Sequence, residues 1–277
     1  RVVQIDELAQ LPRGEYLKPA MLGYHHLGAD ILWIRLLQVI GERQNTEDQY
    51  EWMYHTLDVI TTLDPQYAYA YYVGGVILGD YAHRPDLSNR LLAKGVEANP
   101  AVRNLPFLLG YNYYFLMGDA AKATDYIMRA ASLPDGPSYL PGLATRMAAE
   151  GRKPETALVF LETRLRETND PEMREFFLNR MKEVIIERDL YILEDAVQTY
   201  LSHHHILPTT VTDLVTTGLL PALPTEPFGG RYLIDAKTGI VSSSTHPSRL
   251  RTFFKRKVPP ILLPKVEVPY VFPRTWE

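Results

Sequence analysis

Apolar residues recur at helical spacing along most of the chain, and the apolar stretches end at regularly placed prolines. Pro65, Pro100, Pro134 and Pro171 are 35, 34 and 37 residues apart. A proline lacks the amide hydrogen and fixes the backbone angle φ, so each one marks a point at which a helix ends. A period of this length is typical of a repeated unit of two helices and a turn. The pattern therefore predicts a mainly α fold of antiparallel helical hairpins.

Further helices are expected on both sides of these prolines. Apolar residues keep helical spacing from Glu15 to Gly41, which predicts one long helix. Residues 46–62 are expected to form its antiparallel partner. After the last of the four prolines the pattern predicts two more helices, at residues 171–187 and 190–201, so that the helical part of the chain ends near residue 205.

Small residues recur with the same period inside the predicted helices. Gly75 and Gly110 are 35 residues apart in aromatic-rich stretches, and Gly118 and Gly151 begin turns 33 residues apart. An early aromatic residue, a small residue in mid-helix, a glycine turn and a closing proline resemble the tetratricopeptide repeat (TPR) family. The resemblance covers three repeats over residues 66–171, preceded by a divergent helix pair. It implies a TPR-like α-solenoid whose function is to bind proteins.

Residues 22–35 resemble the opening helix of a group of bacterial envelope repeat proteins, in which an N-terminal anchor tends to lie just upstream. Because the sequence starts at Arg1 and not at methionine, we expect a further segment before it. The resemblance implies a location in the bacterial cell envelope, on the periplasmic side, with membrane association through that upstream anchor. Within the sequence itself, no apolar run approaches the roughly 20 residues of a membrane-spanning helix.

The composition changes after residue 205. A short helix within residues 207–215 is followed by a turn that contains Glu226-Pro227-Phe228-Gly229. The strand pattern then predicts a hairpin that pairs Tyr232–Ile234 with Ile240–Ser242. This series resembles the module that follows the long helix in type II secretion pseudopilins. It implies a small α+β cap over residues 206–246 and carries no activity by itself.

The last 31 residues contain six prolines and cannot form a helix. They hold seven Arg or Lys against two Glu, a balance of +5, so residues 1–246 carry −9 of the net charge of −4. We therefore expect three parts: a helical repeat domain (1–205), the cap (206–246), and an extended basic, Pro-rich arm (247–277) that binds another chain. The candidate contact residues of the arm are Arg251, Phe253, Phe254, Lys255, Arg256, Tyr270, Phe272 and Trp276.

Tyrosine is abundant, at 18 residues, and clusters on the first helix of each predicted repeat. In TPR proteins these helices line a concave face, so the resemblance implies a groove that takes a peptide or helix from a partner. Tyrosine suits such a role because it offers a large contact area at a low entropy cost. The alternative is that most of the rings pack between repeats. The candidate groove residues are Tyr69, Tyr72, Asn104, Phe107, Tyr111 and Tyr114.

The sequence lacks the common catalytic motifs. The absence of cysteine excludes disulfides, Cys-ligated metals and a thiol nucleophile. Neither a phosphate-binding loop nor a His-Glu-x-x-His motif occurs. We therefore expect no enzyme activity, no metal and no cofactor. The alternative from another class is a metal-binding protein or enzyme centred on His25, His26 and His55, which could meet across the first hairpin.

These expectations combine into a non-catalytic scaffold that binds protein partners through the groove and the arm. Two settings are open for it: a pilus, secretion or other envelope assembly, and a structural subunit of a large redox or filamentous complex. Nucleic acid is not expected as a partner, because the charge of −9 on residues 1–246 would repel phosphate.

Overall fold

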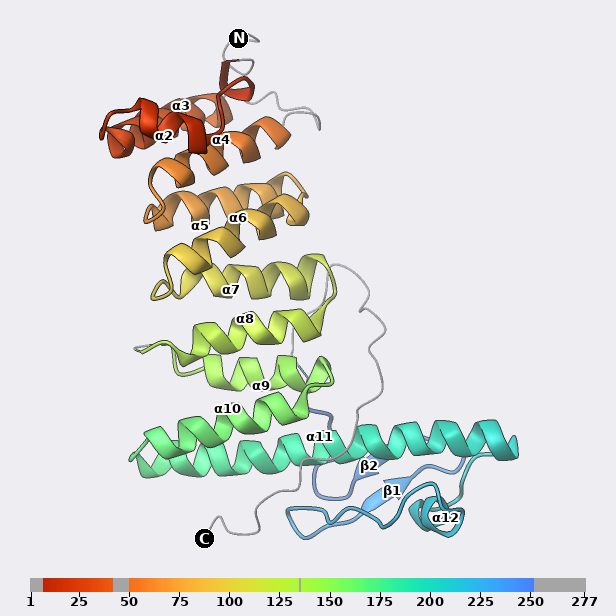
Figure 1. Cartoon of the computed structure of the whole chain (residues 1–277). Coiled ribbons are helices and arrows are strands. Elements are labelled where there is room, and N and C mark those ends of the chain that lie inside the picture. The colour runs from red at the N-terminus through yellow and green to blue at the C-terminus, as the bar shows by residue number, and fades with distance from the viewer. Residues whose placement is uncertain (1–6, 42–49, 135, 252–277) are drawn as a thin grey trace. The chain divides into compact units, whose positions relative to one another are not determined.

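The computed structural model describes residues 7–41, 50–134 and 136–251 (Figure 1). The predicted mainly α fold is confirmed, since nearly all of the regular structure is helical. The chain forms two compact units: unit 1 holds the described residues up to Pro137, and unit 2 holds those from Ser138 onward. The four prolines that mark the sequence period lie between helices, or at the first residue of one in the case of Pro171.

Unit 1 is a succession of helices in which α2 packs against α4 and each helix from α3 onward packs against the next (Figure 1). Together they bury one hydrophobic core that includes Trp52, Leu57, Tyr71, Leu92 and Leu109. Its elements are α2 (Gly14–Ala20), α3 (His25–Gly41), α4 (Tyr50–Leu63), α5 (Ala68–Val76), the π-helical turn η2 (Ile77–Tyr81), α6 (Pro85–Ala98), α7 (Asn104–Tyr111), the π-helical turn η3 (Asn112–Leu116) and α8 (Ala120–Ser132).

The 35-residue period of the sequence is also present in the backbone of unit 1. α5 continues into η2 and α7 continues into η3, and the two π-helical turns begin 35 residues apart, at Ile77 and Asn112. Lys94 and Arg129 are likewise 35 residues apart, and each reaches back to the preceding second helix. Lys94 Nζ donates to Asp58 O at 2.9 Å in α4, and Arg129 Nη2 donates to Val96 O at 3.1 Å in α6. A positive charge near the C-terminal end of a helix also interacts favourably with the helix dipole.

Gly75 and Gly110 occupy close contacts between helices, as the sequence predicts. A Cβ atom built on Gly110 would lie 2.5 Å from Ile127 Cγ1, and one built on Gly75 would lie 2.7 Å from Leu92 Cδ2. Such distances are too short for real Cβ atoms. The absence of a side chain therefore lets α7 approach α8 and lets α5 approach α6.

Two expected helix boundaries are wrong. The long helix predicted over residues 15–41 is broken between α2 and α3, where Leu22 and Gly23 take positive φ angles of 48° and 94°. The two helices predicted after Pro171 form one 34-residue helix, α11 (Pro171–His204). Residues 187–190 do not interrupt it because they contain no helix-breaking residue, and Asp189 is held by the hydroxyl of Tyr232, which donates to it at 2.8 Å.

Unit 2 joins the last helices of the helical part to the segment that follows residue 205. Residues of α11 share a core with Leu214, Tyr232 and Val241. The boundary expected at residue 205 therefore falls inside this compact unit rather than between units. Its elements are α9 (Leu140–Glu150), α10 (Pro154–Glu167), α11, α12 (Val211–Thr216), β1 (Tyr232–Ile234) and β2 (Val241–Ser243).

The predicted hairpin is confirmed with a shift of one residue. β1 and β2 are antiparallel, with Tyr232 opposite Ser243 and Ile234 opposite Val241. Ile240, expected in the second strand, precedes it and accepts a hydrogen bond from the amide of Asp235 at 2.9 Å. Gly239, with φ of 73°, takes the left-handed conformation in this turn. The second strand then begins at Val241 instead of Ile240.

Candidate functional site

Tyr69 and Tyr72 form an exposed aromatic pair on α5. Tyr69 is 61% exposed and Tyr72 is 38% exposed. The ring of Tyr69 lies 5.9 Å from the ring of Trp33 on α3, in an edge-on arrangement. The buried Trp33 thus supports an exposed ring, which gives unit 1 an aromatic surface at the junction of α3 and α5.

The four candidates on and next to α7 differ in exposure. Asn104 is exposed, and Phe107 and Tyr111 are half-buried. The hydroxyl of Tyr111 donates to Asp80 Oδ1 at 3.3 Å. Tyr114 is only 1% exposed, so its assignment to an open groove is wrong. It lies inside the π-helical turn η3, where the widened backbone turns it into the core.

A second exposed apolar surface lies on α3 and was not among the sequence candidates. Leu27, Ile31, Ile34 and Leu37 are exposed, although the same helix buries Leu32 and Leu36. They follow each other at intervals of three or four residues, so they share one face of the helix. A sequence signal existed, because α3 is apolar on more faces than one helix contact can cover.

The histidines do not assemble into a metal site. His26 Nδ1 lies 3.2 Å from Asp64 Oδ2, whereas His55 Nε2 lies 2.8 Å from the carbonyl oxygen of Leu11. The described residues contain no group of three or more His, Cys, Asp or Glu that could hold a metal ion. His203, His204 and His205 are exposed at the C-terminal end of α11.

The described beginning of the arm binds α11 of its own chain. Arg249 Nε lies 2.9 Å from Glu187 Oε2, Arg249 Nη1 pairs with Glu194, and the amide of Leu250 donates to Glu187. Arg251 Nη1 also lies 3.3 Å from Glu187 Oε2. Arg251, expected to contact another chain, is therefore engaged in cis, since the buried carboxylate of Glu187 needs cations beside it. The other seven arm candidates lie outside the described residues.

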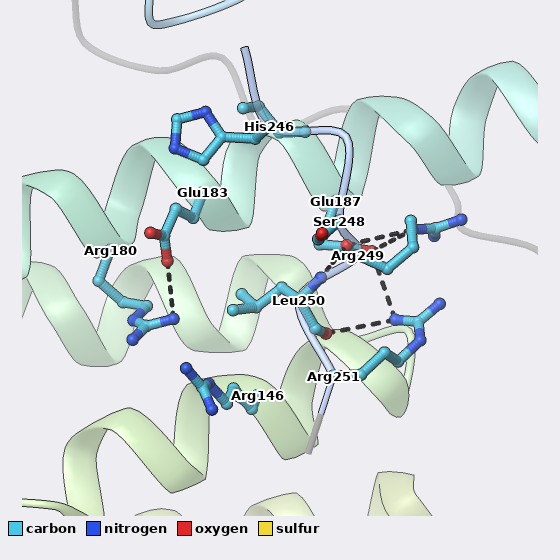
Figure 2. Close-up of a pocket in the computed structure, with 10 residues that line it drawn as sticks. Arg146, Arg180, Glu183, Glu187, His246, Ser248, Arg249, Leu250 and Arg251 are labelled. Carbon is cyan, nitrogen blue, oxygen red and sulfur yellow. Dashed lines mark hydrogen bonds and ion pairs between the residues drawn. The ribbon is translucent and has the colours of Figure 1, made fainter. Parts of the chain in front are cut away.

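Unit 2 contains a cavity of about 280 Å³ between α9, α11 and the segment after β2 (Figure 2). We call it the arginine cavity. Figure 2 shows Arg146 and Arg180 on one side of Leu250, and Arg249 and Arg251 on the side of Glu187. The cavity is lined by Arg146, Arg180, Glu183, Ile186, Glu187, His246, Ser248, Arg249, Leu250 and Arg251.

The arginines on the two sides of the arginine cavity differ in the charges that act on them. Arg249 and Arg251 face the carboxylate of Glu187, and Glu194 adds a second carboxylate to Arg249. Burial alone would lower the pKa of Arg249, but Glu187 and Glu194 raise it above its ordinary value. Arg180 differs: burial lowers its pKa, Glu183 opposes that effect, and the nearby positive charge of Arg146 adds to it. On the side of Arg146 and Arg180, the two guanidinium groups therefore repel each other.

No pattern in the sequence predicts this cavity. Arg146, Arg180 and His246 are separated by 34 and 66 residues and match no local motif. They meet because α9 and α11 pack together and because the chain returns along α11 after β2. Glu183, one turn of helix from Arg180, pairs with it at 2.7 Å and fixes its guanidinium at the cavity.

No protein-family model matches the chain, and no curated protein or solved structure shows significant similarity to it. Within the described residues, every helix is too short or too polar to cross a lipid bilayer.

Proposed function

We propose that the chain is a non-catalytic scaffold that binds a protein partner through unit 1, within a bacterial envelope assembly. Its helices form TPR-like repeats in this proposal, and the segment after α11 is a pseudopilin-like cap. The recurrence of close glycine contacts, π-helical turns and basic residues at 35-residue intervals supports a repeat architecture. Repeats of this kind offer extended surfaces to partners.

The observation that carries the proposal is the exposure of Tyr69 and Tyr72 beside Trp33. Large aromatic side chains at a surface contribute strongly to protein interfaces when a partner covers them. The hydroxyl groups of Tyr69 and Tyr72 form no hydrogen bond with another described residue. The two rings are therefore available to a peptide or helix of a partner, while Trp33 keeps Tyr69 in place from below.

The proposal is tested by replacing Tyr69 and Tyr72 together by alanine and measuring partner capture from the native cell by affinity purification and mass spectrometry. We expect the partner seen with the unchanged protein to be lost or reduced about tenfold or more, with helicity unchanged by circular dichroism. Tyr139→Ala is the matched control, since Tyr139 is about as exposed as Tyr69 but belongs to unit 2. Full capture by the folded double variant would refute the surface assignment.

A further inference from the structure

We propose that the arginine cavity of unit 2 is a binding site for a phosphate-type oxyanion, held between Arg146 on α9 and Arg180 on α11. The inference does not depend on the scaffold role. It rests on the space in the cavity, on a buried donor of Arg180 and on the direction from which each polar group reaches the site.

The cavity has room for such a ligand. Its volume of about 280 Å³ is many times what one water molecule requires. Arg146 comes from α9, Arg180 from α11, and His246 and Ser248 from the segment after β2. Figure 2 shows the guanidinium groups of Arg146 and Arg180 close to one another and below His246. Three chain segments thus direct polar side chains into one space.

Arg180 has a buried donor that the described part of the chain does not satisfy. Its Nη1 atom pairs with Glu183 at 2.7 Å, but its Nε atom is buried without a hydrogen-bond partner there. Its side chain is only 11% exposed. A buried N–H group of a cation is costly to leave unpaired. An oxyanion in the cavity would accept this hydrogen bond and offset the repulsion between the two arginines.

The geometry favours a phosphoryl group over a carboxylate. A carboxylate presents two oxygens in one plane, which a single guanidinium fork can satisfy. A phosphoryl group presents three acceptor oxygens in tetrahedral directions and carries up to two negative charges. It can therefore bridge guanidinium groups from two helices. On this side of Leu250 the positive charge of Arg146 acts on Arg180, and an anion between the two guanidinium groups would reduce their repulsion.

Isothermal titration of the full chain with inorganic phosphate, at fixed ionic strength, tests the proposal. We expect saturable binding and a rise in the melting temperature, because a ligand that binds only the folded state stabilises it. Arg180→Gln and Arg146→Gln should each weaken phosphate binding about tenfold or more. Arg166→Gln is the matched control, since Arg166 is exposed, lies outside the cavity and pairs with Glu162. It should bind phosphate as the unchanged protein does.

Acetate, glycerol phosphate and vesicles of phosphatidic acid in phosphatidylcholine distinguish the ligand class and its source. Binding of glycerol phosphate but not of vesicles supports a soluble phosphate compound, and vesicle binding that phosphate displaces supports a lipid headgroup. Acetate binding as strong as phosphate binding, no saturable binding of any probe, or unchanged binding by both Gln variants would overturn the proposal. If Arg180→Gln does not fold, Arg146→Gln and Arg180→Lys carry the test, and Lys should restore only part of the affinity because it lacks the planar fork.

Discussion

Gly110 lies where α7 and α8 touch, with Ile127 in the place that a side chain would need. The nearest atoms to a Cβ on Gly110 are Ile127 Cγ1 at 2.5 Å and Cδ1 at 2.6 Å. Ile127 is buried and has little room to move. Interiors are packed closely enough that one added side chain must displace its neighbours. The small size of residue 110 is therefore a requirement of helix packing.

Gly110→Leu should destabilise unit 1 by about 1–3 kcal/mol, because the added side chain overpacks the contact with Ile127. Thermal unfolding followed by circular dichroism measures the change. Gly142→Ala is the matched control: a Cβ there would meet only Phe176 Cζ, at 3.7 Å, which is an ordinary contact. Since Gly142 lies inside α9, its replacement should leave stability equal or raise it by about 0.5–1 kcal/mol. Equal melting temperatures for Gly110→Leu and the unchanged protein would contradict the close contact.

The side chain of Glu226 stabilises the turn that contains Glu226-Pro227-Phe228-Gly229 before β1. Its carboxylate accepts hydrogen bonds from the amides of Phe228 at 2.9 Å and Gly230 at 2.7 Å, and from the hydroxyl of Ser243 at 3.0 Å. It also accepts one from Thr245. Burial alone would raise the pKa of Glu226, but these hydrogen bonds together lower it below its ordinary value of 4.5. The charged form therefore holds the turn to the hairpin.

A lowered pKa in the folded state gives Glu226 a defined pH dependence. Its stabilising contribution should be complete above pH 4.5 and should be lost as the pH falls through the lower folded pKa. Denaturant unfolding of unit 2 between pH 7 and pH 3 measures this. Glu226→Gln should be less stable at pH 7 and should show a smaller further loss in acid. An identical pH profile for the two proteins would show that the turn does not depend on the carboxylate.

The continuity of α11 organises unit 2 as a whole. The helix passes without interruption from its contacts with α9 and α10 to its contacts with α12 and β2. Its face carries Glu187, which is almost fully buried at 2% side-chain exposure and receives Arg249, Arg251 and the amide of Leu250. One carboxylate of this helix thus fixes the described beginning of the C-terminal arm. The arginines also lie over the ring of Tyr191, at 5.0 Å and 5.5 Å.

Glu187→Gln should lower the free energy of unfolding of unit 2 by about 3 kcal/mol, since it removes the buried charge that compensates the half-buried guanidinium of Arg249. The measurement is chemical denaturation of the full chain. Glu175→Gln serves as the matched control, because Glu175 is an exposed carboxylate on the same helix. Similar small losses in both variants would show that the docking of residues 249–251 adds little stability.

The division into two compact units sets how the whole chain should respond to truncation. Unit 1 has its own core, and the helices of unit 2 share a core with the hairpin. A helical array can keep its structure when it is shortened, because its contacts are mainly between neighbours.

Fragments 1–137 and 138–277 should therefore each be helical and unfold cooperatively when produced separately. Circular dichroism and denaturant titration of each fragment check this. A third fragment, 1–205, is the comparison, since it ends at the boundary expected from composition and removes the hairpin from the core of unit 2. We expect residues 138–205 to be less stable in that fragment. Normal stability of 1–205 together with an unfolded 138–277 would contradict the observed division.

The sequence by itself determined the helical class, the positions of the turns at the four prolines, the close glycine contacts and the short hairpin. These features depend on local backbone chemistry: proline removes an amide, glycine removes a side chain, and alternating apolar residues form a strand. Such signals act over a few residues, so they can be read without knowing what packs against them. The 35-residue recurrence of these signals in the sequence supports the repeat architecture that we propose.

Only the tertiary structure decided the burial of Tyr114, the continuity of α11, the docking of Arg251 on Glu187 and the arginine cavity. Tyr114 was turned inward by a π-helical turn, which shifts the helical register that the sequence pattern assumes. The cavity depends on side chains far apart in the sequence that share no local pattern. Charge and aromatic content can be counted from a sequence. Whether they face a partner, the solvent or another part of the same chain depends on packing between distant segments.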